Sequence, residues 1–545
     1  MPFVFVEPQR SVCILLFTLE MRNSQTLSYW MATSSKTYFP KLSEDLAADV
    51  AVIGAGIAGL TAAILLKQQG KKVIVIDQFR VAGGESGRTT AHLTEILDTG
   101  YRQLMSDFGK KNARLAAKSS RAAINQIEAF INEFQISCDF QRVPAYLYAE
   151  HEKHLSKLKK EFRAFQEVDL QSKWEEHVPL PFPTFGGIRV ENQAQFHPGK
   201  YLSSLAQSFC GDGCFVFENT KAIAVEDGEP CRVVTEHGVL TVNEVIVATN
   251  SPISNKFFLP THVAAYRTYA LAAKLKGSSP PLGLYWDLDD PYHYTRCEGD
   301  VWIIGGEDHK TGLKEDTEDS FRQLEHYSRS HYGVDRVLYE WSGQVMEPVD
   351  GLPYIGRDLL SKNIFVATGF SGNGMTLGTL SGMLIADLIV KKKNPYSELY
   401  KVSRVKPLAA AREFISENKD FPLCFLKDRM QISEEGTLSE INPGEGKTLK
   451  IDKEPVAAYR DEAGVVHAVS AICTHMGCYV HWNQGEKSWD CPCHGSRFNT
   501  DGKMLNGPAT QDLKKKEVSE VNQQQSEQFK RQVPVARLSR SGGTR

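Results

Sequence analysis

The chain has 545 residues, of which 41% are hydrophobic and 24% charged, and its formal net charge is −3. This length exceeds what one hydrophobic core usually spans, so we expect several domains. The near balance of 63 basic and 66 acidic residues gives no electrostatic footprint for nucleic acid. No apolar run approaches the ~20 residues of a membrane span. We therefore expect a soluble, cytoplasmic protein with no nucleic-acid partner and no membrane span.

Residues 1–44 are expected to be an N-terminal extension. An apolar run at 12–19 has two interpretations. It is either the apolar part of a signal peptide or an upstream stretch ahead of a translation start at Met21 or Met31. Glu20 stands where a signal peptide would need a small-residue cleavage site, which favours the second interpretation.

A compact βαβ unit follows. The β-branched run at 49–53 predicts a strand, 58–69 predicts a helix that Gly70 closes, and 72–77 predicts a second strand that is buried on both sheet faces. This order is typical of the first half of a nucleotide-binding domain.

The turn inside this unit reads Gly54-Ala-Gly56-Ile-Ala-Gly59. Gly54 permits a tight turn, Gly56 lets the backbone approach a pyrophosphate, and Gly59 lets helix and strand pack closely. Asp77 ends the second strand, where a carboxylate can accept hydrogen bonds from a ribose hydroxyl. The pattern predicts a dinucleotide site but does not separate FAD from NAD, and a glycine-rich turn without a cofactor is the alternative.

The rest of the chain divides by composition. Ala123, Ile127, Phe130, Ile131 and Phe134 recur at helical spacing and predict a helix with one buried stripe. The expected body spans residues 45–395, and its substrate domain is mainly 140–345. Within this body the chain returns to the nucleotide domain at 218–252 and again at 350–390. A linker at 396–428, a small strand-rich domain at 429–518 and a disordered tail at 519–545 follow.

Two arginines are candidates for binding a substrate carboxylate. Arg267 and Arg296 lie in the expected substrate domain beside aromatic residues, and guanidinium groups bind carboxylates in a bidentate manner. Tyr294 is a further catalytic candidate, and His293 a weaker one. Surface arginines next to core tyrosines are the alternative. His197 is expected at a helix entry.

Three dispersed motifs resemble the glycine/D-amino-acid oxidase (DAO) family of flavoproteins. They lie at 83–92, 350–356 and 367–375, in the order in which the family has them. The resemblance implies FAD as the cofactor, with the first motif running beside the flavin and the last bringing a helix N-terminus to the ring. The cofactor-binding residues implied are Gly54, Ala55, Gly56, Ile57, Ala58, Gly59, Asp77, Gln78, Ser86, Arg88, Thr89, Thr90, Ala248, Gly369, Gly372, Asn373, Gly374 and Met375.

The C-terminal domain contains a metal-ligand pattern. Cys473-Thr-His475 and Cys491-Pro-Cys-His494 alternate thiol and imidazole in two pairs. In a Rieske [2Fe–2S] centre, two thiolates bind one iron and two imidazoles bind the other. Zinc is the alternative, but zinc sites favour CxxC pairs joined to HxxxH or to a second CxxC.

These two loops resemble those of disulfide-containing Rieske proteins. The resemblance implies a disulfide between Cys478 and Cys493, with free thiols in a reducing cytosol as the alternative. It also implies that residues 507–509 form a proline loop over the cluster. Ser496 matches a serine that donates a hydrogen bond to a cluster sulfur in high-potential members, whereas Phe498 replaces their tyrosine. We therefore expect a lower potential than in that class.

The expected fold is an α/β Rossmann-like, DAO-type FAD-binding body with an interleaved α+β substrate domain, followed by a small all-β Rieske domain. The leading hypothesis is a dehydrogenase that oxidises a small amine or amino-acid-like molecule by hydride transfer to FAD. Single electrons then pass through the cluster to an external acceptor. The alternatives are a reductase in which electrons flow from an external donor, and an electron carrier or redox sensor without turnover.

Overall fold

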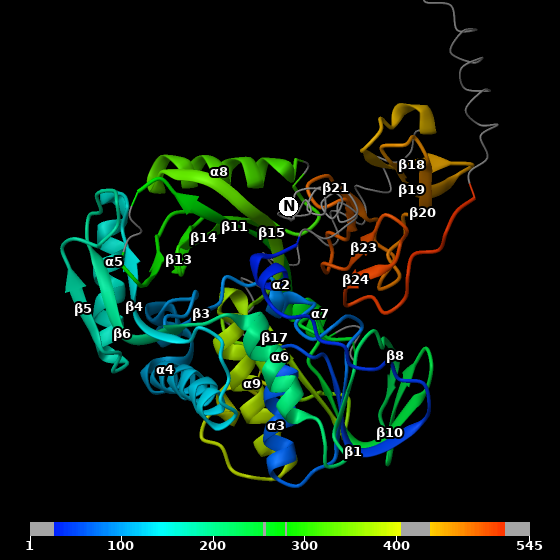
Figure 1. Ribbon diagram of the computed structural model, residues 1–545, viewed down its shortest axis with the longest axis horizontal. Coiled ribbons are helices and arrows are strands. Elements are labelled where there is room, and N and C mark those ends of the chain that lie inside the picture. The colour runs from blue at the N-terminus through cyan, green and yellow to red at the C-terminus, as the bar shows by residue number, and fades with distance from the viewer. Residues whose placement is uncertain (1–26, 254–257, 278–280, 315, 405–435, 518–545) are drawn as a thin grey trace, which may run out of the picture.

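Two large sheets and a small β domain make up the part of the chain that the structure, a computed structural model, describes (Figure 1). The described residues are 27–253, 258–277, 281–314, 316–404 and 436–517. The expected tail at 519–545 and the apolar run at 12–19 lie outside them.

The first sheet is built around β1 (Leu46–Ile53), and β2 (Val73–Ile76) and β10 (Val239–Val247) run parallel on either side of it. β2 is fully buried, and the C-terminal ends of β1 and β10 are buried as well, as the apolar runs predicted. The order is β16-β17-β10-β1-β2-β7, with an antiparallel extension from β10. The other strands are β7 (Phe215–Phe217), β8 (Ala222–Glu226), β9 (Cys231–Thr235), β16 (Tyr354–Arg357) and β17 (Ile364–Thr368). The chain thus returns to this sheet twice, as expected.

Helices α3 (Ile57–Gln68) and α9 (Gly374–Ile389) pack against each other beside this sheet (Figure 1). Glycines permit the close approach, because a Cβ on Gly378 would lie 2.6 Å from Ile57 Cγ2. The predicted helix around 123–134 is the second half of α4 (Tyr101–Glu133), which is kinked at Gly109. Other helices of this body are α6 (Pro198–Phe209), α7 (Phe258–His262) and the 3-10 turns η1 (Glu85–Gly87) and η2 (Ser371–Asn373).

The second sheet forms the expected substrate domain, in the order β15-β11-β14-β13-β12-β4-β6-β3, with β5 beside β6. Helix α8 (Glu318–Tyr332) covers β11, β14 and β15, and α5 (Glu152–Glu167) contacts β5 and β6 (Figure 1). The strands are β3 (His92–Leu93), β4 (Gln141–Tyr148), β5 (Ser172–Glu175), β6 (Gly187–Gln195), β11 (Val263–Leu275), β12 (Leu284–Trp286), β13 (Tyr294–Glu298), β14 (Val301–Lys310) and β15 (Val334–Pro348).

Two segments expected outside the body belong to it. Residues 27–44, expected as part of an extension, contain α2 (Tyr29–Thr33), whose Trp30 is fully buried and donates a hydrogen bond to Thr89 O at 2.5 Å. The start of the expected linker, 396–404, contains α10 (Ser397–Tyr400). Arg404 then forms a buried ion pair with Asp350 at 2.7 Å. The sequence did not indicate these contacts because their partners are distant along the chain.

The C-terminal domain is the expected all-β unit of two small sheets, and it packs on the larger body (Figure 1). His481 Nδ1 lies 2.8 Å from Gly312 O, and Gly485 N donates to Thr317 Oγ1 at 2.8 Å. Its elements are η3 (Leu438–Glu440), β18 (Gly446–Ile451), β19 (Glu454–Arg460), β20 (Val466–Ser470), β21 (His481–Asn483), β22 (Ser488–Asp490), β23 (Arg497–Asn499) and β24 (Met504–Asn506).

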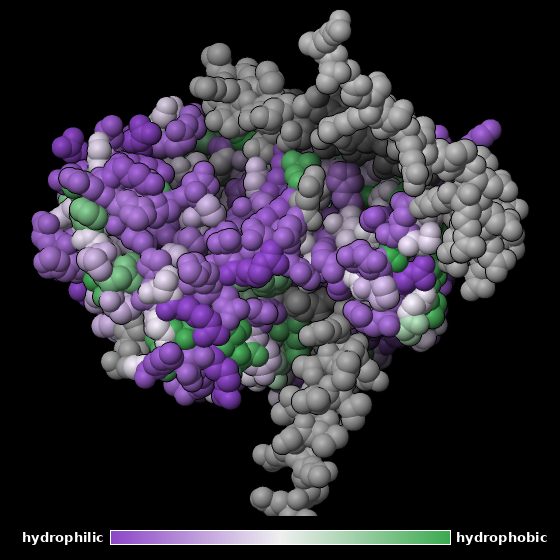
Figure 2. Space-filling model, turned by 90° about the horizontal axis from the view of Figure 1, so that it is seen from above, coloured by the Kyte–Doolittle hydropathy of each residue, from purple (hydrophilic) through white to green (hydrophobic). Residues whose placement is uncertain are grey.

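The surface carries mainly polar side chains. Figure 2 shows that hydrophilic residues cover most of the described atoms on the face it presents. Among the described residues, none of the helices combines the length and apolar character that crossing a membrane requires.

Candidate functional site

The glycine turn after β1 forms a cradle that side chains would fill. Gly54 has φ +114°, and a Cβ there would lie 2.5 Å from Ala248 O. A Cβ on Gly56 would lie 2.7 Å from Ser86 Oγ. A Cβ on Gly59 would lie 1.9 Å from Gly54 O, so Gly59 lets the helix pack on the turn. The three glycines therefore have the geometry expected of a pyrophosphate-binding turn.

Asp77 lies at the end of β2, beside this turn. Its carboxylate accepts hydrogen bonds from the backbone N–H groups of Ala55 and Phe79, both at 2.7 Å. Burial raises the pKa of Asp77 to about 6, although the two N–H groups oppose the rise. The carboxylate is thus fixed by the backbone at the position where a ribose hydroxyl is expected.

One cavity joins this cradle to the second sheet. Its lining includes fifteen of the eighteen predicted cofactor residues: Gly54, Gly56, Ile57, Ala58, Asp77, Gln78, Ser86, Arg88, Thr89, Thr90, Ala248, Gly372, Asn373, Gly374 and Met375. Ala55, Gly59 and Gly369 are not among the lining residues. Backbone N–H groups at a helix N-terminus, glycines and a carboxylate form a donor and acceptor set that fits FAD.

At the side of the second sheet, aromatic groups and one carboxylate line the cavity. Asp98 Oδ2 accepts from Gly372 N at 2.7 Å, and burial raises the pKa of Asp98 to about 6. The hydroxyl groups of Tyr294 and Thr268 lie 2.6 Å apart. The aromatic residues there are His92, Trp286, Tyr292, Tyr294 and Phe370. Burial, followed by the charge of Arg296, lowers the pKa of His92 to about 3.

Neither predicted carboxylate-binding arginine is available to a substrate. Arg267 is fully buried, and its Nη2 lies 2.7 Å from Glu486 of the C-terminal domain. Arg296 is also fully buried, and it pairs with Glu298 at 3.0 Å and donates to Thr90 O. Neither arginine lines the cavity. A substrate role for the two arginines stays a prediction, since both lie outside the cavity lining and pair with carboxylates, whereas Tyr294 lines the cavity.

The two predicted histidines outside the cluster have structural partners. His293 contacts Asp287 at 3.1 Å and Glu307 at 3.3 Å. Burial lowers its pKa, but these two carboxylates outweigh burial and raise the pKa to about 9. His197 is the N-cap of α6, where its side chain accepts from Lys200 N, as the helix-entry prediction stated.

The two predicted cluster loops share one backbone hydrogen-bond pattern. In each loop the first residue donates to the carbonyl of the sixth at 2.8 Å, and the fifth donates to the carbonyl of the first at 3.0 Å. The fifth residue is a glycine with φ +76° in both loops. In the first loop, Cys473 N donates to Cys478 O and Gly477 N donates to Cys473 O. In the second loop, Cys491 N donates to Ser496 O and Gly495 N donates to Cys491 O.

The four predicted ligands come together between these loops. The rings of His475 and His494 have centroids 4.9 Å apart and are nearly perpendicular. The side chains of Cys473 and Cys491 are both buried. Burial lowers the pKa of His494 to about 3, which keeps the imidazole in the neutral form that ligates metal. Two thiols and two imidazoles on facing loops fit a Rieske [2Fe–2S] cluster.

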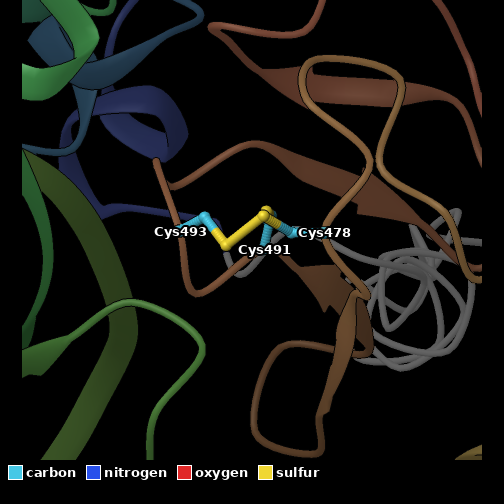
Figure 3. A group of neighbouring side chains, drawn as sticks. All are labelled: Cys478, Cys491 and Cys493. Carbon is cyan, nitrogen blue, oxygen red and sulfur yellow. A yellow bond between two sulfur atoms is a disulfide. The ribbon is translucent and has the colours of Figure 1, made fainter. Parts of the chain in front are cut away.

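Cys478 and Cys493 are joined by a disulfide between the two loops, with a Cα–Cα distance of 6.6 Å (Figure 3). Cys491 lies beside the bond, so three sulfur atoms gather there. Two of them are oxidised and cannot act as thiolate ligands. The pairing agrees with the prediction, and Cys491 remains a ligand candidate for the cluster.

Comparison with known families decides the identity. A family described as FAD dependent oxidoreductase (DAO) matches residues 49–388, and the Rieske [2Fe-2S] domain matches residues 433–517.

The chain belongs to the DAO family of FAD-dependent oxidoreductases. Its cofactors are FAD and a Rieske [2Fe–2S] cluster. The chain is 34% identical over 495 residues to YhfW of Bacillus subtilis, named as a Rieske 2Fe-2S iron-sulfur protein, covering 89% of this chain and 97% of YhfW. It is 26% identical to the gamma-glutamylputrescine oxidoreductase of Escherichia coli, covering 67% of this chain and 89% of that protein.

Solved structures support the fold of the DAO body. The glycine oxidase from Geobacillus kaustophilus has a TM-score of 0.58 at 16% identity, and the match covers 66% of this chain and 99% of that one. At this identity the likeness concerns the fold alone.

Gln344 on β15 connects the FAD cavity to a cluster loop. Gln344 lines the cavity, and its Nε2 donates to Gly495 O at 2.9 Å. Gly495 follows the cluster ligand His494 directly. Sequence reasoning missed Gln344, as well as Asp98 and Glu486, because no motif surrounds them. A polar residue in a buried strand was the only signal for Gln344.

Proposed function

We propose that this flavoprotein is a dehydrogenase for an amine. FAD accepts a hydride when bound, and the cluster passes electrons singly. A C–H bond next to the amine nitrogen breaks, its electron pair leaves with the hydrogen as hydride, and the nitrogen loses a proton to give an imine. The two electrons then leave one at a time to an external acceptor.

The contact between cavity and cluster carries this proposal. Gln344 lines the FAD cavity and donates a hydrogen bond to the loop that holds His494. A buried interface fixes this arrangement, with Arg267 and Arg497 both paired to Glu486 at 2.7 and 2.8 Å. These contacts between the cavity and the cluster loop support direct electron transfer from FAD to the cluster.

Asp98 is the group that we expect to handle the substrate proton. It lines the cavity, Gly372 N fixes its orientation, and its pKa near 6 leaves most of the carboxylate ionised at neutral pH. An ionised carboxylate can accept a proton from a cationic amine. Tyr292 and Tyr294 line the same cavity, and their rings can pack against a cationic or apolar substrate.

We infer that the substrate is an amine without an α-carboxylate. Arg267 and Arg296, the cations expected to bind such a group, are engaged elsewhere. Lys221, which lines the cavity, pairs with Asp512 of the Rieske domain at 2.9 Å. The printed name of the relative from E. coli, gamma-glutamylputrescine oxidoreductase, is consistent with an amine substrate.

A turnover screen tests the proposal. Mono- and diamines and the α-amino acids are assayed with the protein, loaded with both cofactors, and an artificial electron acceptor. The proposal predicts turnover of amines and slower or absent turnover of α-amino acids. No turnover of any compound would favour the electron carrier, and preferred turnover of α-amino acids would contradict the substrate class.

A further inference from the structure

The Rieske domain contributes to the wall of the FAD cavity. Residues 504–507, which are β24 and the residue after it, line the cavity together with Gly54 and Gly56. Thr510 lines it as well. The cavity therefore lies between two domains that are matched by two separate families.

Two hydrogen bonds connect segment 504–507 to the cofactor side of the body. Gln78 Nε2 donates to Leu505 O at 3.1 Å, and Asn506 Nδ2 donates to Glu85 Oε1 at 2.9 Å. Gln78 follows the ribose-site carboxylate Asp77 directly, and both Gln78 and Glu85 line the cavity. The segment is thus bonded to the parts of the body that are expected to touch FAD.

The same loop continues to the cluster. Ala509 N donates to Ser496 Oγ at 3.0 Å, which fixes the proline loop against the second cluster loop. A Cβ on Gly507 would lie 3.4 Å from Ile253 Cγ2 of the body. One short stretch, 504–509, therefore has the FAD cavity on one side and the cluster loops on the other.

A buried ion-pair network holds this stretch in place. Glu486 lies between Arg267 of the body and Arg497 of the Rieske domain, and all three side chains are nearly or fully buried. Arg497 is the first residue of β23, the strand next to β24. The network thus fixes β23, the strand that pairs with the cavity wall.

We propose that the FAD site of this protein is composite, with segment 504–507 of the Rieske domain as a wall that retains the cofactor. Binding of FAD and docking of the Rieske domain then stabilise each other, because linkage between two equilibria is reciprocal. The cluster domain has a second task beyond electron transfer, which is to hold FAD in the body. This inference concerns the cofactor and is independent of the substrate.

An FAD titration of the full chain tests the proposal. FAD is removed, the cluster is kept, and the dissociation constant is measured by flavin fluorescence. Asn506→Ala should weaken FAD binding about tenfold, the size expected for one hydrogen bond to a charged group. The matched control is Asn442→Ala, which removes a similar bond to Glu445 at 3.0 Å on an exposed part of the same domain. It should leave the constant within twofold of the unaltered chain.

Hydrogen exchange of the unaltered chain gives a second measurement that needs no variant. Addition of FAD should slow amide exchange in segment 504–507. If Asn506→Ala loses the EPR signal of the cluster, its FAD affinity no longer tests the proposal. The hydrogen exchange of the unaltered chain then tests it instead. The composite site would be overturned if Asn506→Ala and Asn442→Ala, each with an intact cluster, bound FAD with equal dissociation constants. It would also be overturned if FAD left amide exchange in 504–507 unchanged. Neither measurement contains a substrate, so the result does not depend on the proposed dehydrogenase activity.

Discussion

The ion pair between Arg267 and Glu486 gives the sharpest stability prediction. Arg267 lies in the second sheet and Glu486 in the Rieske domain, and their side chains are 0% and 1% exposed. Glu486→Gln removes the charge that balances Arg267, whereas Arg497 keeps Asp490 at 2.9 Å. Removing one partner of a buried pair typically costs about 3–5 kcal/mol, because an uncompensated charge stays buried.

The pKa of Glu486 supports the same magnitude. Burial raises this pKa, but Arg267 and Arg497 outweigh burial and lower it from 4.5 to about 2. A shift of that size corresponds to about 3 kcal/mol. Because the folded-state pKa is the lower one, this stability is present above pH 4.5 and is lost as the pH falls toward 2.

Urea unfolding at pH 7, followed by the visible absorption of the cluster, measures the effect. We expect Glu486→Gln to lower the free energy of unfolding of the Rieske domain by about 3 kcal/mol. The control is Glu398→Gln, which removes an exposed pair with Lys401 and should change little. If the two variants unfolded at the same urea concentration, the assignment of Arg267 to the interface would be refuted.

Three further predictions concern the two redox centres. Asp98→Asn should lower kcat/KM for the amine and remove the acidic limb of the pH–rate profile near pH 6. The limb is expected because activity falls when Asp98 is protonated below its pKa. An unchanged limb would exclude Asp98 as the base. Replacing Cys478 and Cys493 together by Ser should speed loss of the cluster to a chelator, followed by visible absorption, whereas Cys210→Ser in the body should not. Ser496→Ala should lower the reduction potential of the cluster, and Phe498→Tyr should raise it, as a redox titration can measure. The reason is that hydrogen bonds to the cluster sulfurs tune Rieske potentials within about −150 to +300 mV. Shifts in the opposite direction would contradict this assignment.

Local patterns predicted the cofactor sites because their chemistry is compact in sequence. The glycine turn after β1 and the acidic end of β2 lie within one βαβ unit, where strand period and turn residues fix the geometry. The cluster ligands likewise lie in two short loops. In both cases the residues that act together are near neighbours along the chain.

The substrate residues were not predictable in this way. Arg267 has the composition of a carboxylate-binding site, with tyrosines on either side, yet its partner Glu486 is 219 residues away. Asp98 follows a short strand without any motif, and its orientation depends on Gly372 from a distant segment. Residues 27–44 also looked like an extension, although Trp30 is fully buried. Long-range packing decided all three cases.

The central claim is that electrons pass from substrate to FAD and then to the cluster within one chain. Anaerobic rapid mixing of the fully loaded protein with an amine substrate tests it most directly, with flavin absorbance and the Rieske EPR signal followed in one time course. We expect bleaching of the flavin first and the EPR signal of the reduced cluster afterwards. Reduction of the cluster while the flavin stays oxidised, or a flavin that is reduced without any later reduction of the cluster, would contradict it.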